Sequence, residues 1–130
     1  MKKNLARIWP SITCTIIIFI LLAIPTGGVN EIGMLDIIGA DKIIHLFLFM
    51  AFTFFWGHYF TLTNPLNQKL ILALLILVGS AYGLGMEYYQ KFFTQRNFSL
   101  LDALADAIGT IIGAIVVKKS PYGNRGRNQN

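Results

Sequence analysis

Charged residues are scarce in this 130-residue chain, where they occupy 13% of positions and only six are acidic. Ordinary globular domains carry about 25% charged residues, so the composition excludes a water-soluble domain of this size. Hydrophobic residues instead make up 55% of the chain, and its mean hydropathy is +0.58. Apolar runs long enough to cross a bilayer recur along it. The chain is therefore predicted to be one polytopic membrane domain.

Cysteine is nearly absent as well. Cys14 is the only cysteine and lies within an apolar run, so the sequence offers no intrachain disulfide and no cysteine metal site. A single histidine, His45, accompanies the acidic residues that are discussed below, and zinc usually takes more nitrogen or sulfur ligands. We therefore expect no metal ion and no cofactor.

Four apolar stretches predict four transmembrane helices, at about residues 8–24, 43–60, 70–90 and 100–117. The first follows a short basic head. Because this run is long and no A-x-A site follows it, we interpret it as an uncleaved helix rather than a signal peptide. Residues 29–40 are expected to form a loop amphipathic enough to lie on the membrane surface. Residues 91–98 are predicted to form a polar hairpin, and residues 118–130 a basic, disordered tail.

The basic residues indicate how the helices are oriented. Eight of the eleven lie at the termini or in the turn after the second helix, whereas the other three and all six acidic residues lie in the opposite segments. Loops rich in Lys and Arg stay in the cytoplasm, so we predict an all-α bundle of four transmembrane helices with both termini cytoplasmic. This distribution is a topology signal rather than a basic face, and no nucleic-acid partner is expected. The eight residues are Lys2, Lys3, Arg7, Lys69, Lys118, Lys119, Arg125 and Arg127.

Glycine and acidic residues share one face on each of the last two predicted helices. At about 100° per residue, these faces contain Asp102, Asp106, Gly109 and Gly113 on the fourth helix, and Gly79, Gly83, Met86, Glu87 and Gln90 on the third. Glycine lets helix backbones approach closely, and carboxylates in an apolar helix face protein or water rather than lipid. The third and fourth helices are therefore predicted to pack together and to enclose a polar site.

Polar residues gather at the outward ends of the second, third and fourth helices. Ionisable residues within a membrane are functional hypotheses by default, and the inner half of the bundle has only His58, near an interface. We therefore predict an outward-facing polar cup, closed below by apolar packing, that binds a ligand. The residues of this polar cup are Asp41, Lys42, His45, Glu87, Gln90, Arg96, Asp102 and Asp106.

Structural roles remain alternatives for several of these residues. The segment from Ser99 to Asp102 fits a capping box, in which both side chains satisfy free N–H groups at a helix start. Asp41 can be the N-cap of the second helix, Lys42 can extend to the lipid head groups, and Arg96 can clamp the hairpin through a carboxylate. The glycine stripes can serve packing alone.

Two carboxylates fit such roles least. Glu87 and Asp106 each lie about one turn inside a predicted helix, away from the ends of their own helices. A functional role is therefore best supported at these two positions.

The order and spacing of these motifs resemble the VanZ-like family of small membrane proteins over about residues 41–113. The matching motifs are Asp41-Lys42-x-x-His45, Glu87-x-x-Gln90, Arg96 and Asp102-x-x-x-Asp106-x-x-Gly109-x-x-x-Gly113. Where the family usually has Asn, this chain has Asp106. The family is named for a protein associated with low-level resistance to the glycopeptide teicoplanin. The resemblance implies one domain over residues 1–117 in the cytoplasmic membrane of a bacterial cell envelope.

A binding function is the first interpretation of the polar cup. Its ligand would be a lipid head group, a lipid-linked cell-wall precursor or the lipid-bearing glycopeptide itself. Arg96 and Lys42 would contact phosphate or carboxylate, while Gln90, Glu87 and Asp106 would contact sugar or peptide groups. Membrane lipids or lipid-linked intermediates are thus the expected partners, and formation of a homo-oligomer stays open.

An intramembrane enzyme acting on a similar substrate is the second interpretation. His45 would be its general acid or base, because the unperturbed pKa of imidazole lies near neutrality. Asp41 or Glu87 would hold the ring, and Asp106 would be a further catalytic candidate. No nucleophile motif supports this interpretation. A transporter ranks last, since it needs polar groups through the whole membrane depth.

Overall fold

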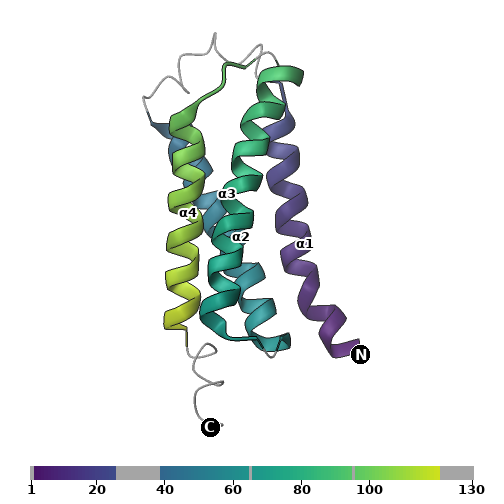
Figure 1. Cartoon of the computed structure of the whole chain (residues 1–130). Coiled ribbons are helices and arrows are strands. Elements are labelled where there is room, and N and C mark those ends of the chain that lie inside the picture. The colour runs from purple at the N-terminus through teal and green to yellow at the C-terminus, as the bar shows by residue number, and fades with distance from the viewer. Residues whose placement is uncertain (1, 26–38, 65, 95, 121–130) are drawn as a thin grey trace.

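The computed structural model describes residues 2–25, 39–64, 66–94 and 96–120, with the side chains of residues 2–6 left aside. These residues form four helices: α1 (Lys2–Ala23), α2 (Ala40–Thr63), α3 (Gln68–Phe93) and α4 (Leu100–Lys119). The helices run up and down side by side, so that α1 begins and α4 ends at the same end of the bundle (Figure 1). α1 packs on α2 and α3, whereas α4 packs on the other side of these two helices. The predicted all-helical bundle is confirmed.

Three of the helices, α2, α3 and α4, are long and apolar enough to cross a membrane, and the apolar part of α1, Arg7–Ala23, is shorter. Large apolar side chains cover the outside of the bundle; Leu77 is 66% exposed and Phe92 is 71% exposed. The inside contains fully buried polar side chains, among them Glu87 and Asp106. This distribution is the reverse of that in a water-soluble helical bundle.

The glycines of α4 let its backbone approach the backbone of α2. A Cβ atom on Gly113 would lie 2.5 Å from the carbonyl oxygen of Met50, and one on Gly109 would overlap the carbonyl oxygen of Leu46. Both glycines are buried, as their stripe predicts. Their partner differs from the predicted one, however, because they face α2 rather than α3. Only a residue without a side chain fits where two backbones are this close.

The glycines of α3 face side chains of α4. A Cβ atom on Gly83 would lie 2.6 Å from Cβ of Asp106, and one on Gly79 would lie 2.5 Å from Cγ2 of Thr110. The predicted buried face of α3 and its contact with α4 are therefore confirmed. Since Asp106 lies directly over Gly83, the packing of α3 on α4 also determines where this carboxyl group sits.

The helices extend further than the sequence predicts. α1 begins at Lys2 rather than near residue 8, and α3 continues to Phe93, into the predicted hairpin. α4 includes Lys118 and Lys119, which the sequence places in a disordered tail. Two cations in the last turn interact favourably with the helix dipole, which explains this extension. Most of the predicted surface loop, and the tail after Ser120, lie outside the described residues.

Candidate functional site

A histidine–carboxylate pair lies at the centre of the predicted polar cup. Nδ1 of His45 on α2 is 2.8 Å from Oδ1 of Asp106 on α4, and both side chains are fully buried. A buried carboxylate is costly unless it is hydrogen-bonded or paired, so each of these groups provides the partner that the other needs. The pair joins the two helices whose backbones approach through Gly109.

Glu87 of α3 joins this pair from a third helix and also caps α4. Its Oε2 accepts a hydrogen bond of 3.0 Å from the backbone N–H of Ser99, and the side chain is fully buried. One ligand-type atom from each of His45, Glu87 and Asp106 lies within 4.8 Å of the other two. We call these three residues the inner triad.

Two ion pairs lie above the inner triad and form its rim. Nζ of Lys42 lies 3.3 Å from Oδ1 of Asp102, and Nη2 of Arg96 donates a hydrogen bond of 2.8 Å to Oδ2 of Asp41. The side chains of Lys42 and Asp41 are 39% and 40% exposed, and that of Asp102 only 5%. We call these two ion pairs the rim pairs.

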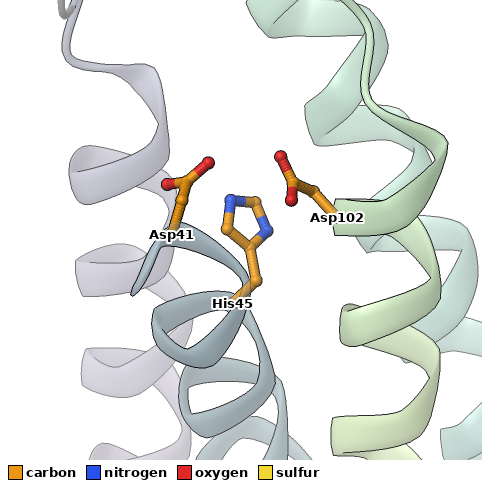
Figure 2. Close-up of side chains that lie close together, drawn as sticks. All are labelled: Asp41, His45 and Asp102. Carbon is orange, nitrogen blue, oxygen red and sulfur yellow. The ribbon is translucent and has the colours of Figure 1, made fainter. Parts of the chain in front are cut away.

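Figure 2 shows two carboxyl groups of the rim pairs beside His45 of the inner triad. The carboxyl groups of Asp41 and Asp102 approach the imidazole ring of His45 from either side. Asp41 and His45 share one face of α2, as their i, i+4 spacing predicts. The polar residues of three helices thus form one continuous cluster.

The described structure also settles the capping alternatives. Ser99 is the N-cap of α4, where its Oγ accepts a 3.2 Å hydrogen bond from the N–H of Asp102. The second half of the predicted capping box is wrong, because the N–H of Ser99 bonds to Glu87 and not to Asp102. The carboxyl group of Asp102 instead forms an ion pair with Lys42.

Three further alternatives have clear outcomes. Asp41 is not the N-cap of α2, since Gly39 occupies that position with a φ of 110° that glycine tolerates best. Arg96 does clamp the hairpin to the start of α2, through one hydrogen bond rather than two. Lys42 forms an ion pair with Asp102 within the cluster, so extension toward the lipid head groups is not the only role of its ammonium group.

Gln90, a predicted residue of the polar cup, makes a hydrogen bond to α1 that the sequence does not indicate. The side chain is buried, and its Nε2 donates a 2.9 Å hydrogen bond to the carbonyl oxygen of Leu22 near the end of α1. The last carbonyl groups of a helix lack partners within that helix, so Gln90 satisfies one of them. It therefore anchors α1 to α3 at the level of the polar cluster. No pattern in the sequence of α1 indicates this contact.

Several polar atoms of the inner triad keep unused bonding capacity. Nε2 of His45, Oε1 of Glu87 and Oδ2 of Asp106 are buried and have no hydrogen-bond partner among the described residues. Buried polar atoms are nearly always paired with protein, water or an ion. Each residue of the inner triad thus contributes one atom with unused capacity.

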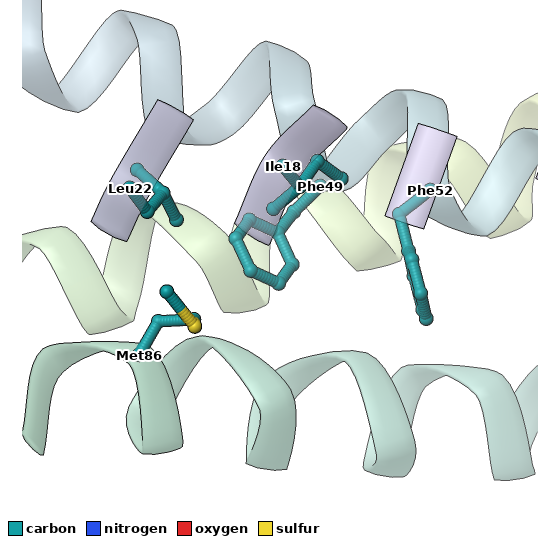
Figure 3. Close-up of a cluster of buried hydrophobic side chains, with 5 residues drawn as sticks. All are labelled: Ile18, Leu22, Phe49, Phe52 and Met86. Carbon is teal, nitrogen blue, oxygen red and sulfur yellow. The ribbon is translucent and has the colours of Figure 1, made fainter. Parts of the chain in front are cut away.

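Apolar packing closes the bundle beneath the polar cluster. Five buried side chains from α1, α2 and α3 form this core (Figure 3), namely Ile18, Leu22, Phe49, Phe52 and Met86. Further toward the opposite end, an open and mainly apolar groove of about 570 Å³ lies between the same helices, lined by residues that include Thr15, Trp56, Phe60 and Tyr82. At this groove Nε1 of Trp56 donates a 2.9 Å hydrogen bond to Oγ1 of Thr15, which joins α2 to α1.

The chain is similar to an uncharacterized protein of the fission yeast Schizosaccharomyces pombe. The two are 31% identical over 102 residues, which cover 76% of this chain and 59% of the yeast protein. The chain therefore spans less than two thirds of the length of that relative. No protein-family model and no solved structure matches the chain.

Proposed function

We propose that this protein is a multi-pass protein of the cytoplasmic membrane whose polar cluster binds the phosphate-bearing head group of a lipid or of a lipid-linked cell-wall precursor. The observation that supports it most strongly is the position of the rim pairs. Two partly exposed cations lie at one end of a bundle with an apolar outer surface, directly above fully buried ionisable groups. That position corresponds to the head-group level of a bilayer.

The placement in a membrane rests on the outer surface of the bundle. Exposed Leu, Ile and Phe side chains cover all four helices, and lipid is the solvent in which such a surface is stable. The distribution of Lys and Arg puts the start of α1 and the end of α4 in the cytoplasm. The polar cluster, at the other end, then opens toward the outside.

The chemistry of the rim fits a phosphate. Arg96 has five N–H donors, and one of them bonds to Asp41. The remaining donors can bind phosphate oxygens in the planar geometry that Arg favours. Lys42, with a 39% exposed side chain, adds a second cation, and Asp41 can accept hydrogen bonds from amine or hydroxyl groups of the same head group.

Similarity to known proteins gives limited guidance about the ligand. The motif resemblance to VanZ-like proteins favours a lipid-linked cell-wall precursor or a glycopeptide. The similar yeast protein favours a phospholipid head group, because phospholipids occur in bacterial and yeast membranes alike. The phosphate is common to phospholipids and lipid-linked precursors, and we therefore place it at the centre of the proposal.

Native mass spectrometry of the full chain, purified in mild detergent, tests the proposal. We expect the wild type to retain a phosphate-bearing lipid and Arg96→Ala to retain much less of it. Arg7→Ala is the matched control, because Arg7 is exposed and lies near the opposite end of the bundle. Equal lipid retention in the wild type and Arg96→Ala would contradict the proposal.

An intramembrane hydrolase is a second candidate, favoured by the pairing of His45 with Asp106. A carboxylate on Nδ1 fixes the tautomer of an imidazole and leaves Nε2 free to act as a base. In such an enzyme His45 would gain and lose a proton in each turnover, so His45→Gln would abolish turnover and leave lipid binding nearly intact. Hydrolysis assays on phosphate-bearing lipids would distinguish the two functions.

A further inference from the structure

The inner triad differs from the rim pairs in one respect that bears on ligand binding. Asp41 and Asp102 each have a cationic side chain within ion-pair distance, whereas no Lys or Arg of the described residues contacts Glu87 or Asp106. His45, Glu87 and Asp106 come from three different helices and are fully buried. The inner triad is therefore an anionic pocket without its own cation.

The net charge of the whole polar cluster also indicates that a cation is missing. Four carboxyl groups and two cationic side chains lie together, and a neutral imidazole adds no charge. If all four carboxyl groups are ionised, two negative charges are left over. An uncompensated charge inside an apolar bundle is costly, so the cluster needs either protons or a doubly charged cation.

We propose that the inner triad binds one divalent metal ion through an imidazole nitrogen of His45 and one oxygen each of Glu87 and Asp106. Oε1 of Glu87 and Oδ2 of Asp106 have no hydrogen-bond partner among the described residues, and one imidazole nitrogen of His45 lies within 4.8 Å of an oxygen of each, so the lone pairs that such an ion requires are present. The proposal goes beyond head-group binding by the rim pairs and does not depend on it.

The distances in the inner triad suit a single ion after a small adjustment. Ligands at about 2.0–2.2 Å from a metal lie at most about 4.4 Å from one another, and the ligand atoms here lie within 4.8 Å. In a tetrahedral site the ligands lie about 3.3–3.6 Å apart, so we expect the carboxyl groups of Glu87 and Asp106 to rotate toward the ion when it binds. Three protein ligands leave at least one further position, which water or a ligand oxygen can occupy.

The ligand set favours a first-row transition metal over magnesium or calcium. Magnesium and calcium prefer oxygen ligands alone, whereas imidazole suits zinc and iron. One nitrogen with two carboxylates is also compatible with manganese, which binds more weakly than zinc to the same ligands. We therefore expect the inner triad to bind zinc with much higher affinity than magnesium. This proposal differs from the sequence-based expectation of no metal. That expectation rests on the scarcity of His and Cys, and the sequence does not show that buried oxygens of Glu87 and Asp106 lack hydrogen-bond partners.

Calorimetric titration of the full chain in detergent, after treatment with a chelator, tests this proposal with Zn²⁺ and Mg²⁺ as probes. We expect one Zn²⁺ per chain and at least about tenfold weaker binding of Mg²⁺. Glu87→Gln and Asp106→Asn should each weaken Zn²⁺ binding at least about tenfold, since even outer-shell changes have effects of that size. Both amides can still accept the hydrogen bonds that the carboxyl groups accept now, so the fold is preserved. His58→Gln, which changes the other histidine, is the control and should bind like the wild type.

A second measurement needs no variant. Saturating Zn²⁺ should raise the unfolding temperature of the wild type, because a ligand that binds only the folded state stabilises it. Absence of both heat and thermal shift would overturn the proposal and indicate that the cluster holds protons instead. Undiminished binding in Glu87→Gln and Asp106→Asn would overturn it too, and a loss confined to Asp41→Asn would place the ion at the rim.

Discussion

Asp106 of α4 lies between His45 of α2 and Gly83 of α3. Oδ1 of Asp106 is 2.8 Å from Nδ1 of His45. A Cβ atom added to Gly83 would lie 2.6 Å from Cβ of Asp106. One carboxyl group therefore couples the packing of three helices to the chemistry of the polar cluster. A change in either neighbour should affect both stability and function.

The His45–Asp106 pair should show strong energetic coupling. Replacing His45 with Ala leaves a buried carboxyl group without its partner, which we expect to lower the free energy of unfolding by about 3–5 kcal/mol. Asp106→Asn retains a hydrogen-bond acceptor and should have a smaller effect. A double-mutant cycle in mixed micelles measures the coupling, and strictly additive effects would show that the two residues do not interact.

Substitution of a glycine should lower stability where two helices are in close contact and should have little effect where the position is open. Gly113→Leu places a side chain against the carbonyl oxygen of Met50, and we expect a loss of at least about 1–3 kcal/mol, the usual range for overpacking. Gly85→Leu is the matched control, because a Cβ atom there has nothing within 4 Å. Thermal unfolding in detergent compares the two variants. Equal stability would mean that α4 does not approach α2 through its glycines.

The N-cap of α4 should contribute measurably to stability. Ser99→Ala removes the acceptor for the N–H of Asp102, with an expected cost of about 0.5–2 kcal/mol. Ser120→Ala changes the serine that follows α4, where the cap contact is made by its backbone N–H, and should have little effect. If Ser99→Ala unfolds like the wild type, Glu87 alone is sufficient to cap the helix.

The proposed orientation can be tested by single-cysteine labelling in a Cys14→Ser background. Leu66 and Asn97 are exposed residues at opposite ends of the bundle. In intact cells, an impermeant thiol reagent should label Asn97→Cys, and it should label Leu66→Cys only after the membrane is opened. The reverse pattern would place the polar cluster in the cytoplasm and contradict the orientation.

Much of this architecture is predictable because hydrophobic runs and periodic stripes are local properties. The number of helices, the burial of Gly79 and Gly83, and the capping role of Ser99 all follow from residues near one another in the sequence. A 3.6-residue period determines which residues share a face, but not which neighbouring helix that face meets. The sequence therefore predicts that Gly109 and Gly113 are buried, and it misses that α2 is their partner.

The details of the site depend on contacts between distant residues. Glu87 is twelve residues from Ser99 and takes the role that the capping-box pattern gives to Asp102. Gln90 bonds to the end of α1, 68 residues away. Such partners are chosen by the packing of whole helices, so the sequence indicates which residues gather but not which atoms bond.

The most direct test of the proposed function compares two substitutions in the same cluster. Arg96→Ala removes a planar cation at the rim, and charge-assisted hydrogen bonds contribute about 1.5–3 kcal/mol, so the affinity for a phosphate-bearing lipid should fall about tenfold or more. Asp106→Asn leaves the rim pairs in place, so its lipid affinity should stay within about threefold of the wild type, a difference well below 1.4 kcal/mol. Lipid titration monitored by native mass spectrometry, at matched amounts of folded protein, measures both. A large loss in Asp106→Asn beside normal binding by Arg96→Ala would contradict the proposal and indicate a carboxyl group that must ionise.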